Sequence, residues 1–323
     1  MPAQRRFLHL YTGQGYTVTQ DYINRLDGLC FTDFIIHLGY HTKSTLKSSQ
    51  SASERTNIIN QSISDLDKFL DMHIKSPLFQ NNNDNIWIST PHIDPESFAN
   101  AIDFQRNMED FMSRAVELVM KKDINLYNRD FQGFNFRTEA AHPNYQKIDA
   151  SNPVSNQMVR LMNNMAYYVR NTVSRQFMWN PYYGTGTLAE NVIHNVGVIT
   201  NRTNIFDFVL IQPSYYFNPT EQHKINLSRV RTSAKDKAVV DINGNPVAGG
   251  RASYATAKIG VIMEVDNDGI PGKSKNAIYE ECRKELNPLV MDRTIPIAWY
   301  AGTPDNISNV SKLRDLITAF WNY

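Results

Sequence analysis

The sequence predicts an α/β fold, a (β/α)8 barrel of the TIM type that forms one domain over residues 1–323 with insertions at its rim. Eight short apolar runs recur at roughly forty-residue spacing, which leaves room for the helical crossover that parallel strands require. The chain of 323 residues is also long enough for a barrel, which takes about 250 residues, with additional loops. The runs are Phe7–Tyr11, Phe34–Leu38, Ile86–Ser89, Phe134–Glu139, Phe177–Tyr183, Phe208–Tyr216, Ile259–Asp266 and Ile295–Tyr300.

Segments between these runs have the apolar periodicity of helices. Asn57–Ile74 places its isoleucines, leucines and Phe on one face and would follow the second strand. Pro95–Lys121 begins with a proline behind Asp94, a favourable N-cap, and would precede the fourth strand. Val154–Arg175 and Lys275–Leu286 repeat the pattern.

Three stretches are typical of insertions. Ser44–Arg55 is rich in Ser, Thr and Lys, Gln80–Asn85 is nearly all amide, and Ala238–Arg251 predicts a hairpin with a tight turn. Rim loops of a barrel often tune specificity, and a plain surface turn is an equally good interpretation of each.

Composition limits the kinds of partner. With 33 basic and 32 acidic residues, the net charge is +1 and no basic patch for nucleic acid or an anionic membrane stands out. Cys30 and Cys282 are too few for a disulfide scaffold or zinc cluster, and we expect buried thiols. We expect no cofactor and no protein partner.

No segment approaches the roughly 20 apolar residues of a membrane span, and Met1–Arg6 contains no signal-peptide hydrophobic region. The expected location is therefore conditional. It is outside the cell or on its surface if an export signal has been removed, and the cytoplasm otherwise.

Alternation along two strands directs carboxylates toward the barrel mouth. Side chains alternate along a strand, so Phe134 and Phe136 would face the helices while Asn135, Arg137 and Glu139 face inward. A charge among apolar neighbours in a buried strand is costly unless it is paired or functional. Glu139 is therefore a predicted pocket residue.

The seventh run repeats this pattern. Val261, Met263 and Val265 would face the helices, and Glu264 and Asp266 would face inward. Active sites of these barrels lie at the C-terminal ends of the strands, so Glu264 would face the other glutamate across the mouth.

Other strand ends supply a lining suited to a sugar. Aromatic faces match the apolar face of a pyranose ring, while amide, Arg and Tyr groups can pair with its hydroxyls. No phosphate-binding fingerprint is present. The predicted substrate-binding residues are His9, Tyr11, His37, Arg137, Trp179, Asn180, Tyr182, Tyr183, Gln212, Tyr215, Tyr216, Asp266, Trp299 and Tyr300, of which His9, Tyr11, His37, Gln212 and Trp299 are assigned inward parity.

Each assignment has a structural alternative. Strand-end aromatics also cap barrel cores, and His9 and His37 fit satisfied interior histidines better than metal ligands. The structural alternative for the two glutamates is an ion pair, for instance with Arg137.

Part of the chain resembles a known family. Trp179–Gly184, Phe206–Val209 and Gln212–Phe217, with a Gly-Phe strand ending at Glu139 and a late strand bearing Glu264, resemble domain-of-unknown-function family 4855 over roughly residues 130 to 305. This resemblance implies a bacterial glycoside-hydrolase-type barrel with a site at these residues.

A second motif bears on the mechanism. The stretch from Gln132 to Glu139 is similar in rhythm to the Asp-Gly-x-Asp-x-Asp-x-Glu motif of chitinase-like glycosidases, with Gln132, Asn135 and Arg137 at the aspartate positions. In that family the third aspartate orients the substrate acetamide. Arg137 therefore argues against a substrate-assisted reaction, and only Glu139 matches.

Glutamates on strands four and seven are similar in layout to the large clan of retaining glycosidases, which commonly have Asn directly before the first glutamate, where this chain has Thr138. The resemblance implies Glu139 as acid/base, with a pKa raised by its pocket, and Glu264 as nucleophile. Carboxyl groups about 5 to 5.5 Å apart would indicate retention, and about 6.5 to 9.5 Å inversion, with Asp266 or Asp94 as candidate base.

The sequence thus favours a retaining glycoside hydrolase acting on a poly- or oligosaccharide in an open groove lined by Trp179, Tyr183, Tyr216 and Trp299. Two alternatives remain open: a non-catalytic carbohydrate-binding or surface protein on the same scaffold, and a metal-dependent hydrolase using His9, His37 and Asp266.

Overall fold

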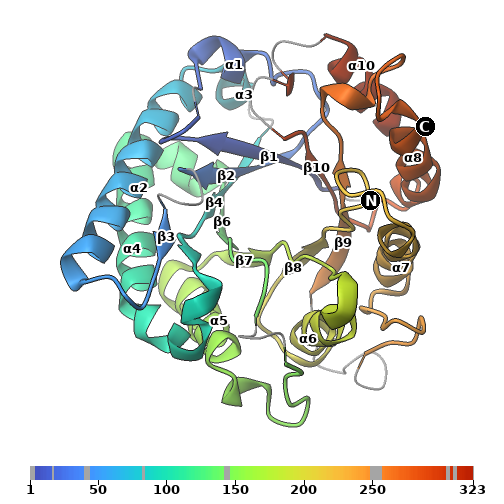
Figure 1. Ribbon diagram of the computed structural model, residues 1–323. Coiled ribbons are helices and arrows are strands. Elements are labelled where there is room, and N and C mark those ends of the chain that lie inside the picture. Colours follow the sequence, from blue (N-terminus) through green and yellow to red (C-terminus); the bar gives the residue numbers. More distant parts are fainter. Residues whose placement is uncertain are drawn as a thin grey trace.

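Eight parallel strands close into a barrel, and helices surround it as an outer ring (Figure 1). The computed structural model describes residues 4–16, 18–39, 44–81, 84–141, 146–247, 257–302, 306–307 and 311–322. The (β/α)8 prediction is confirmed. Around the barrel the strands follow the order β1-β10-β9-β8-β7-β6-β4-β2. They span β1 Arg6–Thr12, β2 Asp33–Leu38, β4 Asn85–Ser89, β6 Phe131–Phe136, β7 Gln176–Trp179, β8 Phe208–Ile211, β9 Lys258–Glu264 and β10 Ile297–Tyr300.

Each predicted apolar run overlaps one barrel strand, because strands buried on both faces have nearly continuous apolar sequences. The fourth strand is shifted most, since β6 begins at Phe131 and ends at Phe136, before Glu139. Two further strands, β3 (Thr45–Leu46) and β5 (His92–Ile93), form a separate parallel pair. They follow β2 and β4, and the hydroxyl of Thr138 accepts a hydrogen bond from the Ile93 amide at 2.9 Å. The small sheet is thereby attached to the chain just after β6.

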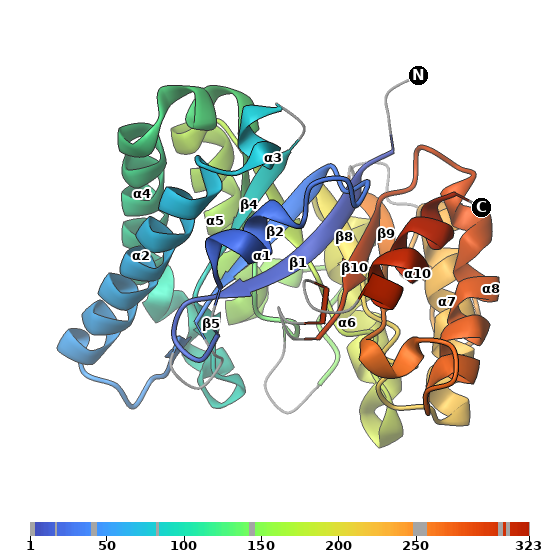
Figure 2. The same cartoon turned by 90° about the horizontal axis from the view of Figure 1, so that it is seen from above.

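The helices pack outside the barrel, with α2, α4 and α5 on one side and α7, α8 and α10 on the other (Figure 2). They span α1 Gln20–Asn24, α2 Ala52–His73, α3 Pro77–Gln80, α4 Gln105–Lys122, α5 Gln157–Tyr168, α6 Ala189–Arg202, α7 Glu221–Asp236, α8 Asn276–Val290 and α10 Ser311–Trp321. Short 3-10 or π segments occur at η2 Pro95–Phe104, η3 Leu126–Asp130, η5 Pro153–Ser155, η6 Val169–Val173, η7 Gly186–Leu188 and η8 Asn267–Gly269. Among the described residues, no helix combines the length and apolar character needed to cross a membrane.

Helix boundaries differ from the prediction where capping decides them. Helix α2 begins at Ala52 rather than Asn57, because Ser51 and Glu54 form a capping box. The end of the predicted insertion Ser44–Arg55 is therefore helical. Asp94 caps the next helical segment as predicted, but that segment begins as η2 and kinks at Asn100 before α4.

The other two predicted insertions extend beyond the described residues. Positions 82–83 and 248–251 lie outside them. Within the hairpin, Val240 and Pro246 form an antiparallel bridge, and the Asp241 carboxylate accepts hydrogen bonds from the amides of Asn243 (2.8 Å) and Asn245 (2.9 Å). The tight turn is present as predicted.

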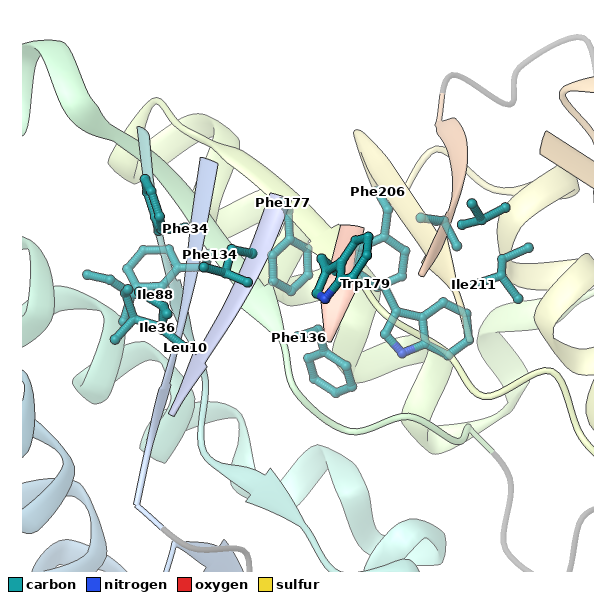
Figure 3. Packing of buried hydrophobic residues seen from close by; sticks show 14 of the residues in the cluster. Leu10, Phe34, Ile36, Ile88, Phe134, Phe136, Phe177, Trp179, Phe206 and Ile211 are labelled. Atoms are coloured by element: carbon teal, nitrogen blue, oxygen red, sulfur yellow. The ribbon is translucent and has the colours of Figure 1, made fainter. Parts of the chain in front are cut away.

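Two apolar layers hold the barrel. The larger one lies between strands and helices, and Figure 3 shows part of it around Phe136, Phe177 and Trp179. The smaller one fills the barrel interior beneath the mouth, and its buried members are Phe7, Ile35, Trp87, Met178, Phe208, Leu210, Ile262 and Ala298.

An ion pair and a cluster of edge-to-face and tilted aromatic rings occupy the opposite end of the barrel. Asp33, fully buried, accepts from Arg5 at 2.7 Å and from the Trp87 indole at 2.9 Å, while the Arg5 guanidinium lies over the rings of Phe7 and Phe208. Because this end of the barrel is tightly packed, we expect the active site at the C-terminal ends of the strands.

Gly133 on β6 is required by a close strand contact. Its φ is +152°, and a Cβ placed there would lie 1.9 Å from the Gln176 carbonyl oxygen of β7. We expect Gly133→Ala to lower the free energy of unfolding by roughly 3 kcal/mol, because two strands must separate. Gly272→Ala, with φ +85° and no atom within 4 Å, should cost only the backbone strain of about 1 to 2 kcal/mol. Urea unfolding measures both, and equal losses would contradict the contact as the cause.

Candidate active site

A pocket of about 120 Å³ opens at the C-terminal ends of the barrel strands. Residues from seven of the eight barrel strands, or from the positions just after them, form its walls. Several predicted substrate-binding residues meet there. The lining consists of His9, Tyr11, His37, Asn135, Arg137, Glu139, Asn180, Gln212, Ile262 and Tyr300.

Glu139 lies three residues beyond β6, the fourth barrel strand, and solvent reaches it through the pocket. Protein nevertheless surrounds its carboxyl on most sides. This burial raises the pKa of Glu139, while a hydrogen bond with Gln212 and the charge of Arg137 oppose the rise. Because more than a third of the residue is exposed, solvent screens these effects.

Glu264 is the last residue of β9, the seventh barrel strand, and is 4% exposed. It pairs in register with Tyr300 of the pocket wall. Burial raises the pKa of Glu264 to about 8, the charge of Glu139 adds to this, and a backbone hydrogen bond from Ser214 opposes it. Ser214 adopts the left-handed conformation with φ +58°, a strained position of the kind found at functional sites.

The protonation of the two carboxyl groups is coupled, because the charge of Glu139 raises the pKa of Glu264. Burial and the negative charge of Glu139 both favour the protonated form of Glu264, whose pKa of about 8 leaves it largely protonated at neutral pH. The predicted rise of the Glu139 pKa is present. The raised pKa therefore places a proton on Glu264, which the sequence did not indicate.

Arg137 is buried and its hydrogen bonds point to the loop after β2. The guanidinium donates to the carbonyls of Leu38 (2.7 Å) and Gly39 (2.8 Å) and to the Ser44 hydroxyl (2.8 Å). Its charge lowers the pKa of Glu139 without using these donors. Arg137 therefore shapes the pocket wall and its potential, and the structural alternative of a Glu139–Arg137 pair is limited to this charge effect.

Stacked rings form one wall. Tyr11 lies parallel to His37 with ring centroids 4.6 Å apart, and His37 lies parallel to His9 at 5.1 Å. Tyr300 packs against Tyr11 at 5.7 Å. Burial raises the pKa of Tyr300 to about 12, and nearby groups including the two glutamates add to this, so its hydroxyl stays protonated.

Amide side chains form the opposite wall. Gln212 donates to the Asn180 carbonyl at 2.8 Å, and its side chain also bonds to Glu139. The Asn180 side chain is 95% buried, yet neither its Oδ1 nor its Nδ2 has a hydrogen-bond partner in the structure. Buried amides are nearly always paired, so this side chain is ready for a ligand with adjacent donors and acceptors.

Four predicted groove residues lie elsewhere. Trp179, Tyr183, Tyr216 and Trp299 are fully buried, so they do not line an open groove. Trp299 faces the helices and packs on Phe320, and its inward parity was wrong because the neighbouring Ala298 and Tyr300 point inward.

Two of the remaining three bond outside the pocket. Trp179 stacks on Phe206, as Figure 3 shows, and its indole donates to the Thr138 carbonyl at 2.8 Å. The hydroxyl of Tyr183 donates to the Val240 carbonyl at 2.6 Å.

Other predicted residues hold loops. Tyr216 donates to Asp266 at 2.6 Å, and Asp266 also caps η8. Tyr215 donates to Glu281 of α8 at 2.7 Å, and Tyr182 bonds to the Thr185 hydroxyl.

Both candidate bases for an inverting reaction are engaged as helix caps. Asp94 caps η2 and forms an ion pair with Lys47 at 3.4 Å. Asp266 accepts a hydrogen bond from Tyr216, so it is not available as the third metal ligand beside His9 and His37 that the metal-dependent hydrolase would need. Within the described ranges, no three His, Cys, Asp or Glu side chains gather closely enough to hold a metal ion.

Sequence reasoning missed three residues of the site. Asn135 was assigned the inward face but not a role, and Ser89 appeared only as the end of the third run. The alternation of inward and outward side chains along their strands could have identified both as pocket residues. Ser214 has no comparable signal, since its left-handed backbone and its bond to Glu264 depend on the loop after β8.

No protein-family model and no curated protein matches the chain. Solved structures do. The chain is similar to GH5_18 from Streptomyces cattleya, solved in complex with Manb1-4GlcNAc, with a TM-score of 0.54 and 11% identity over 92% of this chain and 71% of that one. GH5_18 from Bifidobacterium longum subsp. infantis matches with a TM-score of 0.53 and 9% identity, over 99% of this chain and 79% of that one. A GH18 chitinase from Pseudoalteromonas aurantia matches with a TM-score of 0.49 and 11% identity, over 97% of this chain and 99% of that one.

At these identities the likeness concerns the fold. The chain has the (β/α)8 barrel found in glycoside hydrolase structures, and the chemistry must be argued from its own residues.

Proposed function

We propose that this protein is a glycoside hydrolase in which Glu139 and Glu264 are the catalytic carboxyl groups. One observation carries the proposal: both follow or end barrel strands, four and seven, at the same end of the barrel, and the charge of one raises the pKa of the other. Two coupled carboxyl groups with unequal proton affinities are what glycoside hydrolysis needs.

A retaining reaction is the favoured mechanism. Glu139, which solvent reaches, protonates the glycosidic oxygen, and the ionised Glu264 attacks the anomeric carbon to form a glycosyl-enzyme ester. A water molecule then attacks that carbon, gives its proton to Glu139 and releases Glu264. Because the raised pKa of Glu264 favours its protonated form, substrate binding must shift the proton to Glu139 before the first step.

The proposed substrate is an oligosaccharide end or a single ring of a chain. The pocket of about 120 Å³ is below the roughly 300–1,000 Å³ of a site for a drug-sized ligand. Tyr11 and Tyr300 would contact the ring, and Asn180 and Gln212 its hydroxyls. Arg137 uses three of its five guanidinium donors on Leu38, Gly39 and Ser44, while its Nε has no hydrogen-bond partner in the structure. We also propose kinship with domain-of-unknown-function family 4855.

A glycan panel tests the proposal. We expect the wild-type protein, incubated with oligosaccharides that include Manb1-4GlcNAc, to release products detected by mass spectrometry, while Glu264→Gln releases none. Equal product from both proteins would overturn the assignment of Glu264.

The alternative is a non-catalytic carbohydrate-binding protein, which is favoured by the burial of Glu264 behind the pocket wall. It predicts saturable glycan binding that survives Glu139→Gln and Glu264→Gln, with no product from the wild type. Calorimetry with the same panel separates the two functions.

A further inference from the structure

A chain of four hydrogen-bonded side chains crosses the barrel mouth from β6 to β1. The Asn135 amide nitrogen donates to the Ser89 hydroxyl at 3.0 Å, Ser89 bonds to Nδ1 of His37 at 3.1 Å, and Nε2 of His37 bonds to Nδ1 of His9 at 2.9 Å. All four side chains are buried, with His9 the most exposed at 8%. The chain ends at Nε2 of His9, which is buried and has no hydrogen-bond partner in the structure.

The proton positions along this chain depend on one another. An amide nitrogen can only donate, so Ser89 accepts from Asn135, and its single O–H remains available to donate to Nδ1 of His37. Nε2 of His37 then carries the proton and donates to Nδ1 of His9. Since a neutral imidazole has one N–H, the proton of His9 is on Nε2.

The surroundings keep the His9 ring uncharged and align it with the His37 ring. The His9 and His37 rings are nearly parallel, with 11° between their planes, and Tyr11 stacks on His37 with 14° between those planes. Burial lowers the pKa of His9 to about 3. A cationic histidine near Glu139 and Glu264 would favour their ionised forms and remove the proton that catalysis needs, so a neutral donor suits this site.

We propose that Asn135 and Ser89 are positioning residues that fix the Nε2–H tautomer of His37 and His9, so that His9 offers a neutral N–H donor to a ligand oxygen in the pocket. That this oxygen belongs to a sugar hydroxyl rests on the proposed function. The tautomer itself rests on the hydrogen-bond chain, with Ser89 donating to His37, and not on the proposed function.

Long-range ¹H–¹⁵N correlation of the imidazoles in the full chain, labelled at its eight histidines, tests the tautomers. His9→Gln and His37→Gln identify the two ring signals. In the wild type we expect the Nε2–H pattern for both rings, unchanged down to about pH 5. A proton on Nδ1 of His9 in the wild type overturns the proposal without any variant.

Substitution of the serine tests the coupling. In Ser89→Ala, His37 loses the O–H that holds Nδ1 as an acceptor, and we expect the Nε2–H to Nδ1–H ratio of both rings to fall together, roughly tenfold. Ser89→Thr restores the hydroxyl and should restore the ratio. Ser62→Ala removes another buried hydroxyl, on α2, whose donor goes to the Ile58 carbonyl, and should change neither ring.

Unchanged tautomers in Ser89→Ala, or a change in His37 alone, would contradict the chain. Adding a glycan that the panel shows to bind should shift the His9 Nε2–H resonance. Failure of every glycan to bind would refute the proposed function. The tautomer assignment would still be decided by the spectra of the wild type and of Ser89→Ala.

Discussion

Replacing Glu264 with glutamine is expected to lower kcat on a responsive glycan by about four orders of magnitude or more, and Glu139→Gln by a similar factor on substrates with a poor leaving group. Glutamine keeps the shape of each side chain but can neither attack the anomeric carbon nor transfer a proton. Initial rates of product release by the purified variants measure this. Glu281→Gln is the matched control, because Glu281 lies on α8 in an exposed ion pair with Lys224 and should retain full activity.

Azide distinguishes the roles of the two carboxyl groups. In Glu264→Ala, azide occupies the vacated space and should give a glycosyl azide of inverted anomeric configuration. In Glu139→Ala, azide attacks the glycosyl-enzyme from the other face and should give the retained configuration. Two glycosyl azides with the opposite assignment would exchange the roles, and wild-type rates in both glutamine variants would end the glycosidase proposal.

Protein stability is expected to fall as the pH rises from 5 to 8, and Glu264→Gln should remove much of that fall. The pKa of Glu264 is about 8 in the folded protein and has an ordinary value of 4.5 in the unfolded chain. Between these values the folded state binds a proton that the unfolded state has released, so raising the pH favours unfolding. The contribution is fully present below pH 4.5 and is lost as the pH passes 8.

The expected loss for this group is on the order of 3 kcal/mol across that window, at about 1.4 kcal/mol per unit of pKa difference. Urea unfolding at half-unit pH steps measures it. Glutamine stays neutral throughout, so Glu264→Gln should be more stable than the wild type at pH 8 and similar at pH 5. Glu281→Gln should follow the wild-type slope. A wild-type stability that is flat or rises between pH 5 and 8 would show that Glu264 ionises normally.

Alternation accounts for what could be predicted about the site. It directed Asn135, Arg137 and Glu139 inward and Phe134 and Phe136 toward the helices, because a strand fixed by its neighbours has two faces only. The same rule failed at Trp299, where the choice of face depends on the start of β10, and that start is set by pairing with β1 and β9. A shift of one residue reverses every side chain.

Aromatic residues near strand ends were the least predictable. Trp179, Tyr183 and Tyr216 match a sugar-binding lining by composition, yet each is fully buried. Their polar atoms find partners in the Thr138 and Val240 carbonyls and in Asp266. Such partners come from loops distant in the sequence, and no local pattern reports them.

The sequence by itself determined the eight strands, the barrel and the location of both glutamates at or just after the C-terminal end of a strand, because periodicity and spacing are local properties of the chain. Only the tertiary structure decided which glutamate keeps its proton, since the pKa of Glu264 depends on burial and on the charge of a residue three strands away around the barrel. It also decided that the site is a small pocket with a directed chain of hydrogen bonds ending at His9. Electrostatic coupling and hydrogen-bond direction depend on distances between strands, which form only when the barrel closes.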